Sequence, residues 1–177
     1  MIEVEAVRRG SLPLLDSHLW NPGIPDLHQR RFEVQERGDG LYLAAWEDGA
    51  PIGNVLLHFS HPPHHASYER YPDHAYVEAL DVRLESRRQG VGLALMVSAE
   101  QHARSSGAAD IGLSVGVENT PARALYWKLG YRPADLADYP VSWTYLDPKT
   151  GEPKEEGEIC SYWARPLVDS LLAASQA

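Results

Sequence analysis

Cysteine is the residue that this sequence lacks most clearly, because only Cys160 occurs among 177 residues. A single cysteine cannot form a disulfide within the chain, so a disulfide-stapled secreted scaffold is excluded. No motif of a nucleophilic thiol surrounds Cys160, and we expect it to be a small buried side chain. The cysteine content therefore favours a reducing compartment and predicts a cytoplasmic protein.

Positive charge and long apolar runs are also scarce. Lysine and arginine number 16 against 25 aspartates and glutamates, which gives a formal net charge of −9. Nonspecific nucleic-acid binding depends on basic patches, so we expect no nucleic-acid partner. No apolar run approaches the ~20 residues that span a bilayer, and the opening MIEVEAVRRG lacks the apolar core of a signal segment. We therefore expect no membrane partner and a single domain over residues 1–177, of which 167–177 form a tail.

The dinucleotide fingerprint G-x-G-x-x-G and the P-loop motif are absent too, but one glycine-rich turn remains. Val77, Ala79, Leu80 and Val82 form a short apolar run that predicts a strand. The loop Arg87-Arg88-Gln89-Gly90-Val91-Gly92 follows, and an apolar helix continues from it. A helix N-terminus presents unpaired backbone N–H groups and partial positive charge, so this turn suits a phosphate or pyrophosphate.

Periodicity and turn residues predict the remaining elements. The expected strands cover residues 2–6, 41–46, 52–59, 76–82, 111–117, 139–146 and 158–165. The expected helices cover residues 11–19 with Ser11 as N-cap, 26–37, 90–105 and 120–129 with Thr120 as N-cap. We expect the helix at 90–105 to be buried, because its first half is apolar nearly all round.

The segment from Asn119 to Tyr131 supplies a second motif, Asn-x-x-Ala-x-x-Leu-Tyr-x-x-x-Gly-Tyr. Together with Tyr-Val-Glu-x-Leu-x-Val at 76–82 and Arg-x-x-Gly-x-Gly at 87–92, it resembles the GNAT superfamily of acyl-CoA-dependent N-acetyltransferases. The motifs cover residues 76–131, and one departure is Leu84, where the family usually has proline. Leucine in place of proline makes the loop less stiff but removes no group that takes part in the chemistry.

The resemblance implies a fold and a reaction. The fold is an α/β (α+β) architecture: a mostly antiparallel, seven-stranded mixed sheet with splayed central strands, flanked by about four helices. The reaction transfers the acetyl group of acetyl-CoA to a primary amine of a small molecule, by direct attack in a ternary complex. A protein N-terminal or lysine acetyltransferase and a non-catalytic acyl-CoA-binding regulatory module remain alternatives. Many such domains form homodimers.

The resemblance also assigns site residues. Glu78 is the expected base and Tyr126 the expected acid toward the CoA sulfur. The expected cofactor-binding residues are Leu80, Val82, Arg87, Arg88, Gln89, Gly90, Val91, Gly92, Leu93, Asn119 and Tyr126. Strand alternation places Glu78 on one face with Leu80 and Val82, where apolar surroundings raise the pKa of its carboxyl. The alternatives are a solvent-exposed Glu78, a packing role for Tyr126 and a capping role for Asn119.

Two further groups are candidates for acceptor contacts. In the GNAT fold the first two helices wall the acceptor pocket, which makes Trp20, Asp26 and His28 candidate contacts or simple packing residues. A long polar loop at 60–74 follows a strand and is rich in histidine, the members being His58, His61, His64, His65 and His74. Their spacing matches no common zinc geometry, so we predict no metal site and consider one of them as an auxiliary base or a substrate contact.

Overall fold

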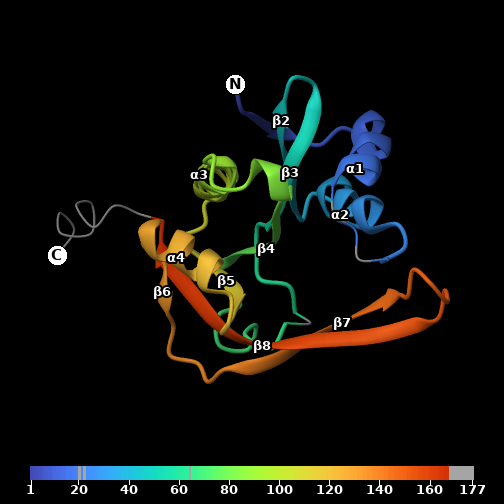
Figure 1. The fold of residues 1–177 in the computed structure, drawn as a ribbon. Coiled ribbons are helices and arrows are strands. Elements are labelled where there is room, and N and C mark those ends of the chain that lie inside the picture. The colour runs from blue at the N-terminus through green and yellow to red at the C-terminus, as the bar shows by residue number, and fades with distance from the viewer. Residues whose placement is uncertain (20, 22, 64, 168–177) are drawn as a thin grey trace.

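A computed structural model describes residues 1–19, 21, 23–63 and 65–167 (Figure 1). Its strands are β1 Glu3–Ala6, β2 Gly40–Glu47, β3 Ala50–His58, β4 Ala75–Val82, β5 Asp110–Gly116, β6 Arg132–Pro133, β7 Tyr139–Leu146 and β8 Pro153–Pro166. Its α-helices are α1 Leu12–His18, α2 Leu27–Glu36, α3 Val91–Ser105 and α4 Thr120–Lys128. Two short 3₁₀ turns, η1 Arg9–Ser11 and η2 Leu84–Ser86, precede α1 and follow β4. None of the described helices is long and apolar enough to cross a membrane.

The strands form one mixed sheet in the order β1-β2-β3-β4-β5-β8-β6, with β7 paired to β8. Only β4 and β5 run parallel, so the predicted mostly antiparallel mixed sheet is confirmed. The described sheet has eight strands instead of seven, because the two-residue strand β6 pairs with β8. Strand β8 also begins at Pro153, before the predicted 158, since its polar first residues pair with β7 in a projecting arm (Figure 1).

Helices cover both faces of the sheet, with α3 and α4 on one side and α1 and α2 on the other (Figure 1). Leu95, Met96 and Ala99 of α3 pack on the first face with side chains of β2 to β5. On the opposite face, Leu15 of α1 and Phe32 of α2 pack against β2 and β3. The outer side of α3 is not buried as predicted: the solvent-exposed fractions of Leu93 and Val97 are 48% and 39%.

The opposite face also carries an aromatic cluster where the loop at 60–74 covers β4, β5 and β8. Tyr71 of this loop stacks on Tyr162 of β8, with the ring centroids 4.9 Å apart. Tyr76, Tyr139 and Cys160 complete the cluster. The prediction that Cys160 is a small buried side chain is confirmed, since it is 3% exposed. The loop is therefore packed onto the sheet over its described residues.

A bulge interrupts β4 at Ala79, whose φ of 57° is in the left-handed region. The register between β3 and β4 shifts between Asn54 and Leu56, and the Asn54 side-chain amide donates to the Ala79 carbonyl at 2.9 Å. A bulge inserts an extra residue, so the alternation of side chains slips by one position. Leu80 consequently packs with Val77 against the α3 side of the sheet. The expectation that Glu78 shares a face with Leu80 and Val82 is therefore wrong.

Strands β4 and β5 stop pairing after Val77, two residues before the bulge at Ala79. Their ladder covers only Ala75 to Val77 against Ile111 to Leu113, although β4 continues to Val82 and β5 to Gly116. Five residues of β4 thus lack a β5 partner, and the two strands leave a gap in the middle of the sheet. The predicted splay of the central strands is confirmed.

Candidate active site

The gap between β4 and β5 adjoins the N-terminus of α3. Gly90 is the N-cap residue with φ of +88°, and no side chain caps the helix. The Val91 side chain is buried in the core, whereas Gly90 and Leu93 are exposed. A side chain at Gly92 would press on Leu125, because an added Cβ would lie 3.3 Å from Leu125 Cδ2. The turn therefore offers backbone N–H groups with no Cβ in front of them, which fits an anionic group.

The polar side chains of the same turn bind protein groups. Arg87 Nε donates to the Val82 carbonyl at 2.9 Å, and Gln89 Nε2 donates to the Glu85 carbonyl at 2.8 Å. Arg88 is exposed and has a φ of 63°. The bonds of Arg87 and Gln89 hold the turn in shape, and the first fixes the Arg87 guanidinium at the end of β4.

Two predicted residues of the second motif lie on or beside α4. Asn119 is its N-cap, in place of the predicted Thr120, and the Asn119 carboxamide oxygen accepts from the Ala122 N–H at 3.2 Å. Tyr126 is 7% exposed and contacts Tyr131 edge to face at 5.9 Å. Burial raises the pKa of the Tyr126 phenol well above its usual value of 10.0, so this hydroxyl keeps its proton and can act as a donor.

Glu78 lies on the opposite side of the sheet between two histidines. His65 Nε2 lies 3.2 Å from Glu78 Oε2, and His58 Nε2 lies 3.5 Å from Glu78 Oε1. Burial disfavours the carboxylate, but the two imidazoles outweigh that cost and hold the pKa of Glu78 well below its usual 4.5. The predicted rise in the pKa of Glu78 is therefore wrong. The burial that the prediction assumed is present, but the prediction did not include the two imidazoles.

A raised carboxyl pKa occurs instead at Asp81, a residue that the sequence reasoning missed. Burial raises the pKa of this carboxyl, and Arg87, whose Nη2 lies 3.8 Å from Asp81 Oδ1, offsets only part of the effect. The contacts of Glu78 with His58 and His65 were missed as well. The histidine-rich loop was the available signal, but nothing in the sequence pairs it with Glu78.

A buried chain of hydroxyl groups fixes the loop beneath Glu78. His61 Nε2 lies 2.8 Å from Ser67 Oγ, and its ring stacks on Tyr76 with centroids 4.4 Å apart. The Tyr76 hydroxyl bonds to Ser114 at 2.8 Å, and Ser114 bonds to the Tyr139 hydroxyl at 2.6 Å. Burial lowers the pKa of His61 to about 4, so its imidazole is neutral at pH 7.

The remaining residues that the sequence suggested as acceptor contacts are Trp20, Asp26, His28, His64 and His74. His28 is 0% exposed, and its Nδ1 lies 2.5 Å from the Tyr42 hydroxyl, so it belongs to the core. Asp26 is exposed just before α2, and Trp20 and His64 lie outside the described residues. His74 Nδ1 contacts the Tyr162 hydroxyl at 3.1 Å. Among the described residues, no group of three or more histidine, cysteine, aspartate or glutamate side chains is arranged to hold a metal ion.

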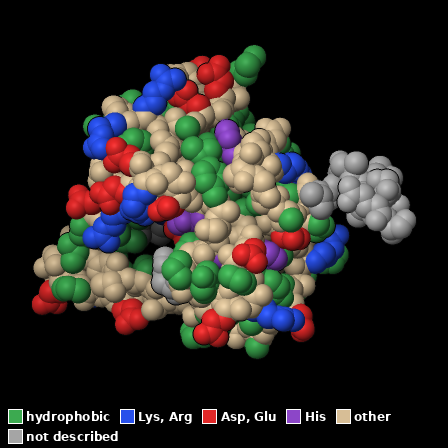
Figure 2. Space-filling model, turned by 180° about the vertical axis from the view of Figure 1, so that it is seen from behind, with side chains coloured by type: hydrophobic (Ala, Val, Ile, Leu, Met, Phe, Trp, Pro, Cys, Tyr) green, Lys and Arg blue, Asp and Glu red, His purple; other side chains and the backbone are tan. Residues whose placement is uncertain are grey.

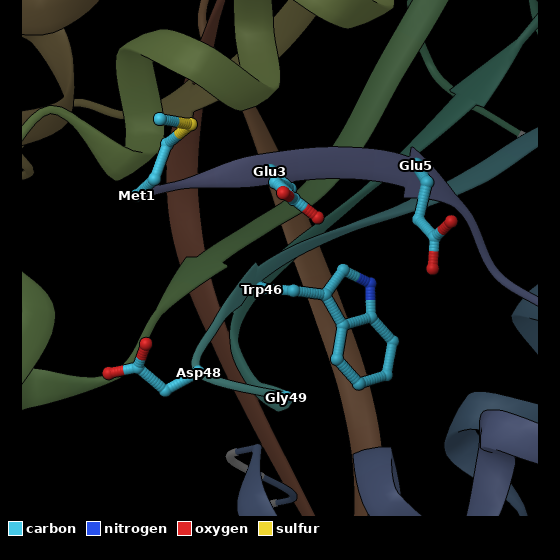
Figure 3. Close-up of a pocket in the computed structure, with 6 residues that line it drawn as sticks. All are labelled: Met1, Glu3, Glu5, Trp46, Asp48 and Gly49. Atoms are coloured by element: carbon cyan, nitrogen blue, oxygen red, sulfur yellow. The ribbon is translucent and has the colours of Figure 1, made fainter.

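The β7–β8 arm faces the loop between α1 and α2. The Leu146 N–H donates to the Gly23 carbonyl at 2.8 Å near the tip of the arm. Figure 2 shows a hollow between this arm and the rest of the molecule. A separate pocket of about 380 Å³ lies at the β1 edge and is lined by Met1, Glu3, Glu5, Trp46, Asp48 and Gly49 (Figure 3). None of the predicted site residues lines that pocket.

The comparisons with known proteins agree with this geometry. The family model described as Acetyltransferase (GNAT) family matches residues 12–131. None of the curated protein sequences gives a significant match.

Solved structures share the fold at low sequence identity. An N-acetyltransferase from Staphylococcus aureus is 14% identical, with a TM-score of 0.67 over 95% of this chain and 99% of that one. A ribosomal-protein-alanine N-acetyltransferase from Brucella melitensis is 16% identical, with a TM-score of 0.66 over 93% and 99% of the two chains. A Salmonella typhimurium protein described as an acetyltransferase and solved with its cofactor acetyl-CoA is 14% identical, with a TM-score of 0.66 over 96% and 95%.

Proposed function

Because this chain belongs to the GNAT acetyltransferase family, we propose that it transfers the acetyl group of acetyl-CoA to a primary amine of a small molecule. The observation that supports this most is the gap between β4 and β5, which opens at the uncapped N-terminus of α3. The pantetheine arm lies in this gap, pairing with backbone groups of Leu80 and Val82 as an extra strand would. The pyrophosphate binds the N–H groups of the turn at 87–93.

The reaction needs a neutral amine and a protonated leaving group. Glu78 and its imidazole neighbours take the proton from the acceptor ammonium, on the face opposite α3. The amine nitrogen then attacks the thioester carbonyl carbon, and the carbon–sulfur bond breaks. Tyr126 gives its proton to the departing thiolate, a role that suits a buried phenol whose pKa is raised. Asn119 orders the end of β5 beside the cofactor.

A protein α-amine is the second candidate acceptor. One of the compared structures is a ribosomal-protein-alanine N-acetyltransferase, and the hollow beside the arm is open to solvent (Figure 2). We also place the protein in the cytoplasm, as one domain, with a homodimer as an assembly compatible with the family.

The test is a thiol-release assay with acetyl-CoA over three acceptor classes: small primary amines, peptides with a free α-amine, and lysine-type amines. Tyr126→Phe should lower kcat about 10- to 100-fold, because the thiolate leaves unprotonated, while the Kd for acetyl-CoA stays unchanged. Thiol release with none of the three classes, together with tight acetyl-CoA binding, would favour a non-catalytic binding module instead.

A further inference from the structure

We infer that His65 is a catalytic residue: its imidazole carries the proton taken from the acceptor amine, while the Glu78 carboxylate stays ionised beside it and His58 holds that carboxylate in place. This inference rests on the proposed function and assigns the proton within the same site. It makes the base a pair of groups from two separate segments, the loop at 60–74 and strand β4.

The geometry brings three segments to one carboxylate. His58 comes from the end of β3, Glu78 from β4 and His65 from the loop, with N–O distances of 3.5 and 3.2 Å to Glu78. The exposed fractions of the His58, His65 and Glu78 side chains are 11%, 17% and 31%. The nitrogen of His58 that faces Glu78 is wholly buried. His58 therefore cannot touch an acceptor through that nitrogen and acts as a positioning residue.

The electrostatics separate the roles of the carboxylate and the imidazole. The two imidazoles more than offset the burial of Glu78, so its pKa lies well below the usual 4.5 and its carboxylate binds protons weakly. Imidazole is a common general base in enzymes, and an adjacent carboxylate orients it and stabilises the imidazolium. Two titratable groups in ring contact with His65 are His61 of the loop, whose pKa burial lowers to about 4, and Tyr76 of β4, whose pKa burial raises. Both are neutral at pH 7.

Packing fixes the position of His65 before any acceptor binds. Its ring lies 4.5 Å from the Tyr76 ring and 5.6 Å, edge to face, from the His61 ring. His61 is itself locked by its stacking on Tyr76 and its bond to Ser67. Such preorganisation is what a catalytic base requires, because a small displacement of the base slows proton transfer.

The step balances without an external reagent. An N–H bond of the acceptor ammonium breaks, its electron pair stays on nitrogen, and the proton binds the imidazole of His65. The neutral amine forms the new C–N bond as the C–S bond breaks. Tyr126 gives its proton to the thiolate, and the amide nitrogen returns its second proton to the Tyr126 oxygen. Water removes the imidazolium proton before the next turnover.

The kinetic test compares His65→Gln and His58→Gln with wild type, using two probes. The probes are alaninamide and Nα-acetyl-lysinamide, whose amines have pKa values of about 8 and about 10.4. At pH 7, His65→Gln should lower kcat/KM roughly 100-fold or more, and the deficit should shrink as the pH rises toward the pKa of each amine. The more basic lysine-type amine should show the larger deficit. The Kd for acetyl-CoA should not change, and His102→Gln, an exposed change on α3, should behave as wild type.

A deficit independent of pH and equal for both amines would overturn the assignment, because a structural defect gives that pattern.

A second measurement needs no acceptor: NMR titration of the Glu78 side-chain carboxyl carbon. We expect the carboxyl to stay ionised below pH 4 in wild type. Its pKa should rise in His65→Gln, because only one imidazole then offsets the burial of the carboxylate. A wild-type pKa at or above 4.5, or no change in the variant, would overturn the pairing. If wild type acetylates neither probe, these two amines are not its acceptors, and this titration still decides whether His65 pairs with Glu78.

Discussion

At the scale of single residues, Ala79 sets the face that each later side chain of β4 occupies. Its left-handed backbone and the Asn54 bond to its carbonyl shift the strand by one position. Glu78, before the bulge, faces the histidine loop, and Leu80, after it, packs against α3 instead of sharing the face of Glu78. A non-glycine residue in this conformation carries a strain of order 1 kcal/mol, so the surrounding contacts hold it there.

Substitutions at Ala79 test this account. Ala79→Val should lower the free energy of unfolding by about 1–3 kcal/mol, because a β-branched residue is strongly disfavoured at positive φ. It should also weaken acetyl-CoA binding, since the bulge opens the gap beside β5. Ala79→Gly should keep both properties near wild type. Urea unfolding and calorimetry measure them, and a Val variant as stable as wild type would show that the bulge does not require this conformation.

Much of the residue-level prediction came from motif spacing, which depends on residue identity alone. It assigned Tyr126, Gly90 and Gly92 to the cofactor site, and this assignment stays a prediction. The pKa of Glu78 was predicted in the wrong direction because its contacts with His58 and His65 were not foreseen, and its face was predicted wrongly because strict alternation along β4 was assumed. The bulge depends on the hydrogen bond from the Asn54 side chain to Ala79, 25 residues away. The local sequence pattern around β4 does not predict that bond. The contacts of Glu78 with His58 and His65 also join separate segments of the chain, so the local sequence pattern does not predict them.

At the scale of elements, the helices follow their sequence signals closely except at their caps. Helix α4 was expected to begin with Thr120 as N-cap, but the Asn119 side chain provides the capping bond. Ser11 occupies the N-cap position of α1 without a side-chain bond to the helix. Cap identity depends on a rotamer and one backbone angle, which residue type alone does not fix. Strand β6 was missed because two exposed residues show no periodicity.

The cap of α4 gives a prediction with an internal control. Asn119→Ala should lower the free energy of unfolding by about 1 kcal/mol, because an N–H group of the first turn loses its acceptor. Thr120→Ala, one residue later, should change it by less than about half that amount. Chemical denaturation of both variants decides the point. Equal losses of unfolding free energy, or a larger loss for Thr120→Ala, would contradict Asn119 as the N-cap and favour Thr120.

At the scale of the whole molecule, the sheet divides the chemistry between its two faces. The α3 side holds the buried Tyr126, and the opposite side holds Glu78 with its histidines. The ladder between β4 and β5 ends at Val77, one residue before Glu78. The fold class, the sheet type and the splay followed from two motifs that cover residues 76–131. The packing of the histidine loop and the contact of the arm with the α1–α2 loop did not, because both join segments far apart in the chain.

The net charge of −9 gives weight to the turn at 87–93 that we propose to bind the pyrophosphate, the phosphate turn. An acidic protein repels an anionic cosubstrate at a distance, so the proposed binding depends on the uncapped helix N-terminus and its neighbouring arginines. Two glycines of α3 allow a matched comparison. Gly90 and Gly107 flank opposite ends of the helix, with φ of +88° and +91°, and an added Cβ meets nothing within 4 Å at either. A glutamate at each position brings the same charge and the same backbone strain.

The most direct test of the proposed function is therefore calorimetric titration of acetyl-CoA into wild type, Gly90→Glu and Gly107→Glu. We predict that wild type and Gly107→Glu bind acetyl-CoA with similar affinity. Gly90→Glu should bind at least about tenfold more weakly, a difference of about 1.4 kcal/mol, because its carboxylate occupies and repels the pyrophosphate position. Equal binding by the two variants would contradict the placement of the phosphate turn, and no binding by wild type would contradict the acetyltransferase proposal itself.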